Sequence, residues 1–299
     1  MAIFLITGGA GFIGSHLCER LLRTGHAVRV LDDLSSGKAA NLPASVDLIV
    51  GDIRDRSAVR AAMAGVEGCF HLGAIASVAR SVAEPALTSS VNIQGTMEVF
   101  AAALEARAPV VYASSAAVYG RSGELGAPLS EATAPEPLSP YAAEKLANEN
   151  SARAFGETRN LRSFGLRFFN VYGPRQNPGS PYSGVISIFM DRARAKQAIT
   201  IFGDGEQTRD FIHVLDVVHF LEAAMTRASV SAPVVNVATG RAVTVRHLAE
   251  MIAQRTCVDI VFGPARRGDV RQSYAATEAA TRLLGVRSAI SLETGLDTL

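Results

Sequence analysis

The chain has 299 residues, of which 48% are hydrophobic, and its formal net charge is +1 at pH 7. This length and composition allow a substantial core in one large domain or two smaller ones, and they exclude a largely disordered protein. The near-zero charge gives no electrostatic case for a nucleic-acid partner or a membrane surface, so we expect neither.

The three cysteines, Cys18, Cys69 and Cys257, are scattered in apolar contexts and lack the spacing of a disulfide framework or a metal site. We therefore expect buried free thiols in a reducing compartment. No apolar run approaches the length of a membrane span, and the chain enters its first strand without a basic leader region. Together these features predict a cytoplasmic protein.

Residues 3–33 combine a strand, a glycine-rich turn, a helix, a second strand and a terminal acid. The apolar run Ile3–Thr7 comes first, and the run Ala27–Leu31 ends on Asp32. Between them, three glycines have the spacing of a dinucleotide-binding turn: Gly8, Gly11 and Gly14. This order within about thirty residues is typical of a dinucleotide-binding βαβ unit.

Each part of this unit has a physical role. Gly8 permits the tight turn, Gly11 lets the backbone approach a pyrophosphate, and Gly14 lets the helix pack closely on the sheet. The helix N-terminus supplies free N–H groups for the phosphates. Asp32 can accept hydrogen bonds from the adenine ribose and would repel a 2′-phosphate, which favours NAD over NADP. The alternative, a turn that binds nothing, is disfavoured because strand, helix and acid are all present.

Apolar runs and helical patterns alternate as far as residue 170, after a polar loop at Leu34–Leu42. Further strands are predicted at Val46–Val50, Gly68–Leu72, Pro109–Ala113 and Ser163–Phe169. Helices are predicted at Arg56–Ala64, Pro85–Ala106 and Ser139–Phe155, the last with Ser139 as its N-cap. This alternation predicts an α/β fold: a doubly wound, Rossmann-type parallel sheet with helices on both faces, and ligands beyond the carboxyl ends of the strands.

The alternation weakens after Asn170. Residues 170–183 are rich in Gly, Pro and Asn and are expected to form a loop. Further helices are predicted at Gly184–Ala195, Val214–Thr226, Thr244–Arg255 and Ala276–Leu284, and further strands at Ile199–Phe202 and Val234–Val237. This part of the chain is expected to form a smaller C-terminal domain.

Tyr141 and Lys145 are four residues apart on a predicted helix and therefore share a face. An ammonium beside a phenol should lower the tyrosine pKa from its usual ~10 and make it a usable general base. Ser115, at the end of a predicted strand, could bridge the substrate oxygen and the phenol. The alternative is an ordinary exposed helical pair. We expect no metal, because the sequence has no histidine pair at ligand spacing.

Over nearly its whole length the sequence resembles the extended short-chain dehydrogenase/reductase family, and within it the nucleotide-sugar 4-epimerases of the UDP-galactose/UDP-glucose type. The segments that carry this resemblance are TGGAGFIGSH, GDIRD, FHLGAIASV, VNIQGT, YASSAAVYG, SPYAAEK, LRFFNVYGPRQ, IFGDGEQTRDFIHVLDVV and RRGD. The resemblance implies NAD as cofactor, a UDP-sugar as substrate, and inversion at C4 of a UDP-hexose through a transient 4-keto sugar.

The resemblance also implies a set of cofactor-binding residues. These are Gly8, Gly11, Phe12, Ile13, Gly14, Asp32, Asp33, Asp52, Ile53, Leu72, Gly73, Ala74, Asn92, Tyr141 and Lys145. Asp52 and Ile53 would flank the adenine, and Asn92 would lie near the pyrophosphate. Leu72 and the two residues after it would line the nicotinamide side of the cleft.

A second implied set contacts the substrate. It consists of Ser115, Tyr141, Asn170, Val185, Phe202, Arg209, Arg266, Asp269 and Ser273. Asn170, Arg209 and Arg266 would hold the diphosphate, the two arginines in bidentate fashion. Phe202 would meet the uracil and Asp269 the uridine ribose. The alternatives are a turn cap for Asn170, a core position for Phe202 and solvated surface charges for the arginines.

In the implied catalytic set, Tyr141 is the base, Ser115 assists it, and Lys145 also holds the nicotinamide ribose. The related 4,6-dehydratases carry an Asp-Glu pair after the strand-end hydroxyl residue, where this chain has Ala116 and Ala117. Since alanine transfers no proton, dehydration is disfavoured, as is decarboxylation that uses a glutamate there. Asp32 disfavours reduction by free NADPH. A non-catalytic NAD-binding protein is disfavoured because all three catalytic residues are present.

A position a few residues past RxGD gates the sugar pocket in this family. Counting from Asp269 places Ser273 there, with Tyr274 beside it, and a slip of one residue would exchange the two. A small residue leaves room for a 2-acetamido group. We therefore expect UDP-GalNAc and UDP-GlcNAc to be accepted as well.

The family pattern also predicts domains and an assembly. Residues 1–170, with about 213–240, are expected to form the NAD-binding domain, and 171–212 with 241–299 the nucleotide-sugar-binding domain. Related enzymes form homodimers through a four-helix bundle, which here would use Gly95–Ala106 and Tyr141–Phe155. The chain departs from the pattern at Ala76, where some epimerases have lysine, and near Ser291–Leu296, where the final helix is expected to be short or absent.

Overall fold

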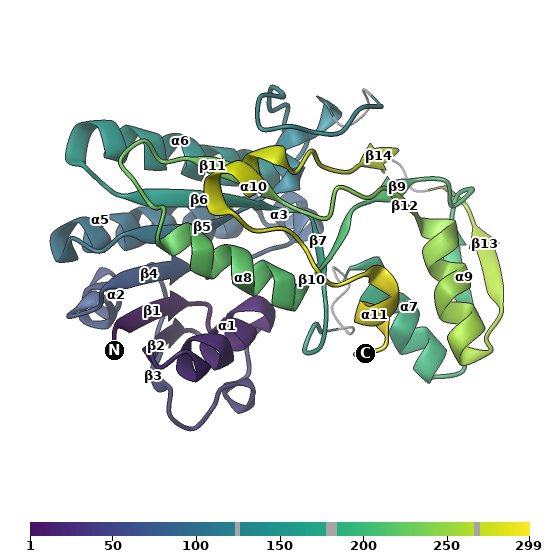
Figure 1. Ribbon diagram of the computed structural model, residues 1–299, viewed down its shortest axis with the longest axis horizontal. Helices are drawn as coiled ribbons and strands as arrows, with labels where there is room; N and C mark the ends of the chain where they lie inside the picture. Colours follow the sequence, from purple (N-terminus) through teal and green to yellow (C-terminus); the bar gives the residue numbers. More distant parts are fainter. Residues whose placement is uncertain (123–125, 178–183, 266–269) are drawn as a thin grey trace.

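The computed structural model describes residues 1–122, 126–177, 184–265 and 270–299. Its largest feature is a seven-stranded sheet with the order β11-β6-β5-β4-β1-β2-β3, in which neighbouring strands are all parallel (Figure 1). The strands are β1 (Ile3–Thr7), β2 (Ala27–Asp32), β3 (Asp47–Val50), β4 (Gly68–His71), β5 (Val110–Ser115), β6 (Ser163–Phe168) and β11 (Val234–Val237). The prediction of a doubly wound parallel sheet is confirmed.

The strand order reverses between β1 and β4. From β1 the chain moves outward to β2 and β3, then returns to the other side of β1 and continues through β4, β5 and β6. Thr7 and His71, the last residues of β1 and β4, are partners in the ladder. The loops that follow them therefore leave the sheet side by side, which is where an open α/β sheet binds its ligands.

Alternate residues of the strands bury against helices on opposite faces. Ile6, Phe70 and Val111 belong to one core cluster with α1 (Phe12–Arg23), α8 (Val214–Met225) and α10 (Glu278–Leu284). Their chain neighbours Leu5, Cys69 and Val110 belong to another cluster with α2 (Arg56–Met63), α5 (Thr96–Ala106) and α6 (Pro140–Arg159). This alternation follows from the two-residue period of a strand, and it explains why both faces are apolar.

The helix predicted at Pro85–Ala106 is divided in the structure. It runs as α4 (Pro85–Ser89), a π-helical turn η2 (Ser90–Gly95) and α5, and the separate helix α3 (Val78–Ala83), which was not predicted, precedes it. Gly95 closes the π-helical turn, and a Cβ there would lie 2.7 Å from the Cδ1 and Cγ1 atoms of Ile53. The wide turn thus brings η2 close to the loop after β3. Such turns frequently mark functional sites.

A predicted helix end agrees with the structure where a side chain next to it in the sequence caps the helix. Ser139 is the N-cap of α6, as predicted, and its side chain accepts a hydrogen bond from the Ala142 N–H. The helix continues four residues beyond the predicted Phe155 and ends at Asn160, which adopts the left-handed conformation. Short 3₁₀ turns at η1 (Ala39–Asn41) and η3 (Ala116–Tyr119) were not predicted.

A smaller region lies beyond the carboxyl edge of the large sheet, at the right of Figure 1. Helices α7 (Val185–Arg194) and α9 (Val245–Thr256) pack with the parallel pair β8 (Ile199–Phe202) and β13 (Ile260–Gly263) around a separate apolar core. The three-stranded sheet β12-β9-β14 joins this region, with β9 (Thr208–Arg209) between β12 (Val243–Thr244) and β14 (Gln272–Ser273). The short final helix α11 (Leu292–Leu296) also packs here, as expected.

The loop predicted for residues 170–183 is partly wrong. Its first residues form β7 (Asn170–Tyr172), which pairs in parallel with β10 (Phe211–His213). Residues 178–183 lie outside the described part of the chain. A three-residue strand whose partner lies forty residues away leaves no periodic signal in the sequence, so local pattern could not reveal it.

The cysteine prediction holds for two of the three residues. Cys18 and Cys69 are buried free thiols, and burial raises the pKa of Cys18 to about 12, which makes it unreactive. Cys257 is exposed at the C-terminal end of α9, so the prediction of a buried thiol was wrong there. None of the helices in the described residues is both long enough and apolar enough to cross a membrane.

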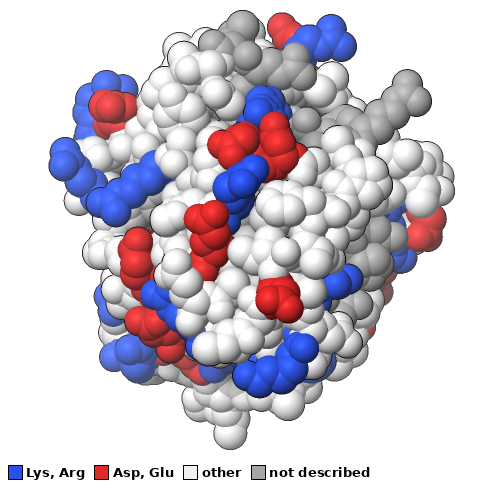
Figure 2. Space-filling model, turned by 90° about the vertical axis from the view of Figure 1, so that its right-hand side faces the viewer, with Lys and Arg blue, Asp and Glu red and all other residues white. Residues whose placement is uncertain are grey.

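Figure 2 shows the face of the smaller region, with acidic and basic side chains interspersed. Several charges of the smaller region are paired, such as Arg246 with Glu206 (2.9 Å) and Arg271 with Asp204 (2.9 Å). The described residues of this face therefore present a mixed surface, without an extended patch of one sign among them.

Candidate active site

The glycine-rich turn after β1 is packed too closely for a side chain at Gly8, Gly9 or Gly14. Gly8 has a φ of +70°, and a Cβ there would lie 2.7 Å from the backbone N of Gly73. A Cβ on Gly14 would lie 2.4 Å from the carbonyl oxygen of Gly8, so α1 packs directly on the turn. Gly9, which sequence reasoning missed, is held equally closely, since a Cβ there would lie 2.4 Å from a methyl group of Val30.

The N-terminus of α1 opens at this turn. Gly11 is its N-cap and provides no side-chain capping bond, and the helix begins with the half-buried residues Phe12 and Ile13. Backbone N–H groups at a helix start favour a bound anion. A cradle that a Cβ would fill and a helix start without a side-chain cap fit the pyrophosphate of a dinucleotide.

Asp32 lies at the end of β2 beside this turn and is 7% exposed. Its two carboxylate oxygens accept hydrogen bonds of 2.9 Å from the Ala10 and Leu34 N–H groups. Burial raises its pKa, and these hydrogen bonds oppose that shift. Asp33 accepts hydrogen bonds from the backbone N–H and the hydroxyl of Ser35. The acid predicted to meet the ribose is thus held rigidly against the glycine turn.

The remaining residues of the predicted cofactor set gather around the same loops. The N–H groups of Leu72 and Gly73 donate to the carbonyl and hydroxyl oxygens of Thr7, at 3.1 and 3.2 Å, so the loop Leu72–Ala74 runs beside the glycine turn. Buried Ile53 lies against Gly73 and Gly95. The Asp52 carboxylate is hydrogen-bonded by Arg54, which lowers its pKa.

The Asn92 side chain is 1% exposed, and its amide forms hydrogen bonds with other groups of the protein. Its Oδ1 accepts from the Ile75 N–H at 2.8 Å, and its Nδ2 donates to the Ile75 carbonyl at 3.1 Å and to Glu144 at 2.6 Å. The amide therefore holds the loop after β4. Its predicted place near the pyrophosphate stays a prediction, and these contacts set it beside the loop Leu72–Ala74 of the predicted cofactor set.

The three predicted catalytic residues come together at the carboxyl end of β5. Ser115 is the last residue of β5, and its side chain is hydrogen-bonded to Tyr141 in the first turn of α6. Lys145, one helical turn later, lies with its Nζ 5.8 Å from the centre of the Tyr141 ring. The Lys145 ammonium donates to the Ala113 carbonyl at 2.9 Å.

The expected low pKa of Tyr141 is not found in the protein alone. Burial raises the pKa of Tyr141 to about 12, although the hydrogen bond from Ser115 opposes the shift. Burial lowers the pKa of Lys145 to about 8. The prediction failed because the sequence shows the spacing of the two groups but not the desolvation around them, which disfavours the charged form of both.

Apart from Ser115 and Tyr141, the predicted substrate residues of the described chain lie in the smaller region or on the strands that lead to it. Asn170 opens β7, and its backbone N–H and side-chain Nδ2 both donate to the Asp210 carbonyl, at 3.0 and 3.2 Å. Arg209 lies on β9, and its Nη1 donates to the Thr208 and Val270 carbonyls at 2.7 Å. Ser273 is the partner of Arg209 in the ladder between β14 and β9.

Two other predicted substrate residues, Phe202 and Val185, lie on other elements of the smaller region. Phe202 is the half-buried last residue of β8, and its carbonyl accepts a hydrogen bond from Gln207. Val185 begins α7 and packs against the core of the smaller region. Arg266 and Asp269 lie outside the described residues.

Sequence reasoning missed a buried polar chain beneath these loops. His71 shares hydrogen bonds with the hydroxyls of Thr7 (2.7 Å) and Thr96 (2.9 Å), and Thr96 donates to the Asn92 carbonyl at 2.6 Å. Burial first, and the Lys145 charge second, lower the pKa of His71 to about 3. The sequence shows that His71 lies at the end of a predicted strand, but it does not show which side chains His71 contacts. No sequence signal could therefore have revealed this series of hydrogen bonds.

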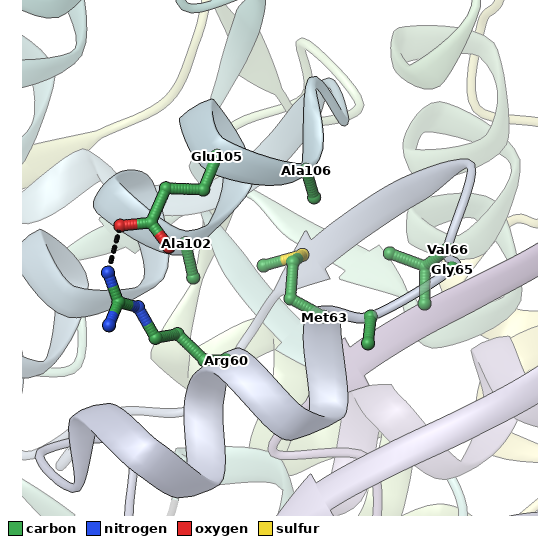
Figure 3. A pocket seen from close by; sticks show the side chains of 8 residues that line it. Arg60, Met63, Gly65, Val66, Ala102, Glu105 and Ala106 are labelled. Carbon is green, nitrogen blue, oxygen red and sulfur yellow. Dashed lines mark hydrogen bonds and ion pairs between the residues drawn. The ribbon is translucent and has the colours of Figure 1, made fainter.

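A hollow of about 460 Å³ lies elsewhere, between α2 and α5 (Figure 3). Its lining consists of Arg60, Met63, Ala64, Gly65, Val66, Ala102, Glu105 and Ala106. Arg60 and Glu105 form an ion pair at its rim. Gly65 and Val66 precede β4, so the hollow is at the amino edge of the sheet and shares no residue with the site at the carboxyl edge.

Comparison with known proteins identifies the family of the chain. Residues 4–238 match the model of the NAD dependent epimerase/dehydratase family. The chain is 38% identical over 302 residues to a UDP-glucose 4-epimerase from Mycolicibacterium smegmatis, covering 98% of this chain and 95% of that protein.

Two solved structures share the whole fold. The UDP-glucose 4-epimerase of Thermotoga maritima, solved with UDP-glucose, superposes with a TM-score of 0.94 at 37% identity, over 99% of this chain and 96% of that one. The UDP-N-acetylglucosamine 4-epimerase of Methanobrevibacter ruminantium, in complex with UDP-N-acetylmuramic acid, gives a TM-score of 0.92 at 33% identity, over 99% and 97%. With the cradle for a dinucleotide described above, these matches show that the chain belongs to the NAD-dependent epimerase/dehydratase family.

Proposed function

We propose that this protein interconverts the C4 epimers of a UDP-hexose, UDP-galactose and UDP-glucose, with NAD as its cofactor. The observation that carries the proposal is the assembly of Ser115, Tyr141 and Lys145 at the carboxyl end of β5, on the same edge of the sheet as the glycine turn that follows β1. The relatives named UDP-glucose 4-epimerase support the substrate class. The family and its members already make the protein a nucleotide-sugar epimerase/dehydratase enzyme.

NAD, when bound, supplies the acceptor and donor of a hydride at C4 of the sugar. We assign its pyrophosphate to Gly8, Gly11 and the start of α1, including Phe12 and Ile13. The other assignments follow the sequence prediction. They are Gly14 for helix packing, Asp32 and Asp33 for the adenine ribose, Asp52 and Ile53 for the adenine, Leu72, Gly73 and Ala74 for the nicotinamide side, and Lys145 for the nicotinamide ribose.

In this proposal Tyr141 takes the proton from the sugar O4 and later returns it. Ser115, hydrogen-bonded to the phenol, orients the same oxygen. Lys145 remains charged below its pKa of about 8 and thereby favours the phenolate, which burial opposes. The balance between these effects sets the pH range in which the base functions.

Inversion requires the sugar to present both faces of C4 to one site. We propose that the protein fixes the diphosphate with Asn170, Arg209 and Arg266, and leaves the hexose free to turn. Phe202 and Val185 would contact the uracil side, and Asp269 the uridine ribose. Binding energy placed on the UDP, away from the reacting carbon, serves both orientations equally.

The domain division follows from this assignment. We propose that residues 1–170, with about 213–240, form the NAD-binding domain, and that 171–212 with 241–299 bind the nucleotide sugar. The placement of β11 beside β6 in the large sheet supports the return of the chain to the first domain. We further propose a homodimer formed through α5 and α6, and action in the cytoplasm, where the buried thiols Cys18 and Cys69 would stay reduced.

Dehydration is the competing reaction within the family. In the structure, Ala116 and Ala117 follow Ser115 directly in η3, at the positions where the dehydratases carry an acid pair. Neither alanine can exchange a proton with the sugar. This observation favours epimerisation.

The test is an assay of purified protein with UDP-galactose and no added reductant. We expect formation of UDP-glucose until equilibrium. The Tyr141→Phe variant should lose activity by about 10²–10⁴-fold, the range for removing a general acid–base group. Near-normal epimerisation by Tyr141→Phe, or a dehydrated or decarboxylated product from the unaltered protein, would contradict the proposal.

A further inference from the structure

Glu144 is a buried carboxylate that the mechanism above does not use. It stands on α6 between the two residues of the catalytic pair, one residue before Lys145, and is only 3% exposed. A carboxylate is costly to bury unless its charge is compensated. Among the residues that the structure describes, no arginine or lysine forms an ion pair with it.

Two uncharged side chains hold the carboxylate in place. Its Oε1 accepts a hydrogen bond from the Thr88 hydroxyl at 2.8 Å, and its Oε2 accepts one from the Asn92 amide at 2.6 Å. Thr88 belongs to α4 and Asn92 to the π-helical turn, so Glu144 fixes the position of α6 relative to both elements.

The hydrogen bond to Asn92 continues to the loop after β4. The Asn92 amide binds both the N–H and the carbonyl of Ile75, as described above. Ile75 directly follows the segment Leu72–Ala74, which lies against the glycine turn. Two steps of hydrogen bonding therefore connect the helix of the catalytic pair to the loop assigned to the nicotinamide.

The negative charge of Glu144 also acts on both members of the catalytic pair. It adds to burial in raising the pKa of Tyr141, and it opposes burial in the case of Lys145. The other groups that face the pair are Ser115 from β5, which lowers the pKa of Tyr141, and His71 from β4, which is uncharged near neutral pH because burial lowers its pKa to about 3.

We propose that Glu144 is a positioning residue with two separable actions: through Asn92 it holds the loop after β4, and from the position before Lys145 on α6 it places a buried negative charge beside the catalytic pair. This inference rests on the proposed function in assigning a catalytic role to the pair. The two actions can be tested without turnover, because one is a matter of hydrogen bonding and the other of charge.

Three variants separate the actions. Glu144→Gln keeps an acceptor for Asn92 but removes the charge, and Glu144→Ala removes both. Glu157→Gln makes the same chemical change on the exposed face of the same helix and serves as the matched control. The readouts are the NMR titration of the Lys145 side chain, assigned with Lys145→Met, hydrogen exchange at the Ile75 amide, and the dissociation constant of NAD.

In Glu144→Gln we expect Lys145 to titrate at a lower pH than in the unaltered protein, and hydrogen exchange at the Ile75 amide to be unchanged. Glu144→Ala should show the same lower midpoint, faster exchange at Ile75 and weaker NAD binding by about tenfold, as for one lost hydrogen bond to a charged group. Glu157→Gln should behave as the unaltered protein. If the titration midpoint of Lys145 is unchanged in Glu144→Gln, the proposed action of the charge is wrong. If hydrogen exchange at Ile75 and the dissociation constant of NAD are unchanged in Glu144→Ala, the proposed positioning of the loop is wrong.

Asn92→Ala provides an independent test if the Glu144 variants fold poorly. It breaks the connection to Ile75 while the carboxylate remains, so it should speed exchange at Ile75 without lowering the Lys145 midpoint. The outcome separates this inference from the proposed function. A protein that shows these shifts but forms no C4 epimer overturns the epimerase proposal alone, and an active epimerase without the shifts overturns the role of Glu144 alone.

Activity adds a readout that a purely structural role would not move. Removing the negative charge lowers the pKa of the Tyr141 phenol, so the acid limb of kcat/KM against pH should move to lower pH in Glu144→Gln. Simple loss of folded enzyme would lower the whole profile without moving that limb.

Discussion

The ladder between β14 and β9 bears on the choice between Ser273 and Tyr274, which counting along the sequence left ambiguous. The sequence places Ser273 and Tyr274 side by side, and successive residues of an extended chain point to opposite faces. In the structure Ser273 is the ladder partner of Arg209, so their side chains share a face, while the carbonyl of Tyr274 accepts a hydrogen bond from Leu129. We therefore propose that the small residue, Ser273, faces the sugar, as the count from Asp269 predicts.

This assignment predicts a change in sugar specificity. Ser273→Tyr should lower kcat/KM for UDP-GalNAc by about 10–200-fold relative to UDP-galactose, because the larger side chain takes the room of the 2-acetamido group. The measurement is the ratio of kcat/KM for the two substrates. Tyr274→Phe, which alters the neighbouring residue without filling that space, should leave the ratio unchanged, and an unchanged ratio in Ser273→Tyr would remove Ser273 from the pocket.

For the Tyr141–Lys145 pair, the sequence predicted the relative position of the two residues but not the pKa of Tyr141. Their four-residue spacing correctly predicted a shared helix face, and the Nζ lies 5.8 Å from the ring. The predicted low pKa of Tyr141 was wrong because burial raises that pKa, and the charge of Glu144 raises it further. Spacing along a helix is a local property, whereas desolvation is set by segments that are distant in the sequence.

At the scale of elements, buried side chains of α6 hold this helix against the neighbouring strands and thereby fix the site. Further along the helix, Glu149 forms a buried ion pair with Arg167 of β6 at 2.7 Å and accepts a hydrogen bond from Ser114. Arg167 also donates to the hydroxyl of Tyr119 at 2.9 Å. These bonds tie α6 to β5, β6 and η3, and so fix the helix of Tyr141 against the strand end of Ser115.

Arg167→Met should therefore destabilise the protein by about 3–5 kcal/mol, because it leaves the Glu149 carboxylate buried without its partner. Urea unfolding of the two proteins gives the difference. The control Arg80→Met removes one member of an exposed pair with Glu84 and should change the unfolding free energy by less than about 1 kcal/mol. Equal effects of the two substitutions would show that the buried pair does not hold α6.

At the scale of the whole molecule, Asp210 connects the two regions. Its carboxylate accepts hydrogen bonds from the N–H groups of Thr239 and Gly240 (both 2.8 Å), which follow β11, and of Ala275 (3.3 Å), which follows β14. Its backbone carbonyl accepts those of Asn170 on β7. Because β11 belongs to the large sheet and β14 to the smaller region, one buried side chain sets how the two regions meet.

The buried His71 makes the global stability depend on pH. Burial lowers its pKa to about 3, below the ordinary value of 6.5 that the unfolded chain would show. Between pH 6.5 and about 3, the unfolded state therefore binds a proton that the folded state does not. The unfolding free energy should fall with decreasing pH in this window, by about 1.4 kcal/mol per pH unit from this group alone.

Urea unfolding at a series of pH values checks this sign. In His71→Gln the fall between pH 6.5 and 3 should be shallower than in the unaltered protein, whatever the difference in absolute stability. The carboxylates Asp32 and Asp210, whose pKa values burial raises, act in the opposite direction but equally in both proteins. Identical slopes would mean that His71 is not the neutral buried group described here.

The sequence by itself determined the sheet, the cofactor turn and the pairing of Tyr141 with Lys145. These features are local: the period of apolar residues selects strand or helix, and glycine spacing selects the turn. Only the tertiary structure decided the π-helical turn, the short strands β7 and β10, the raised pKa of Tyr141, and the connection from Glu144 through Asn92 to Ile75. Each of these depends on contacts between segments far apart in the chain, and such contacts and the burial they cause leave no periodic pattern in the sequence.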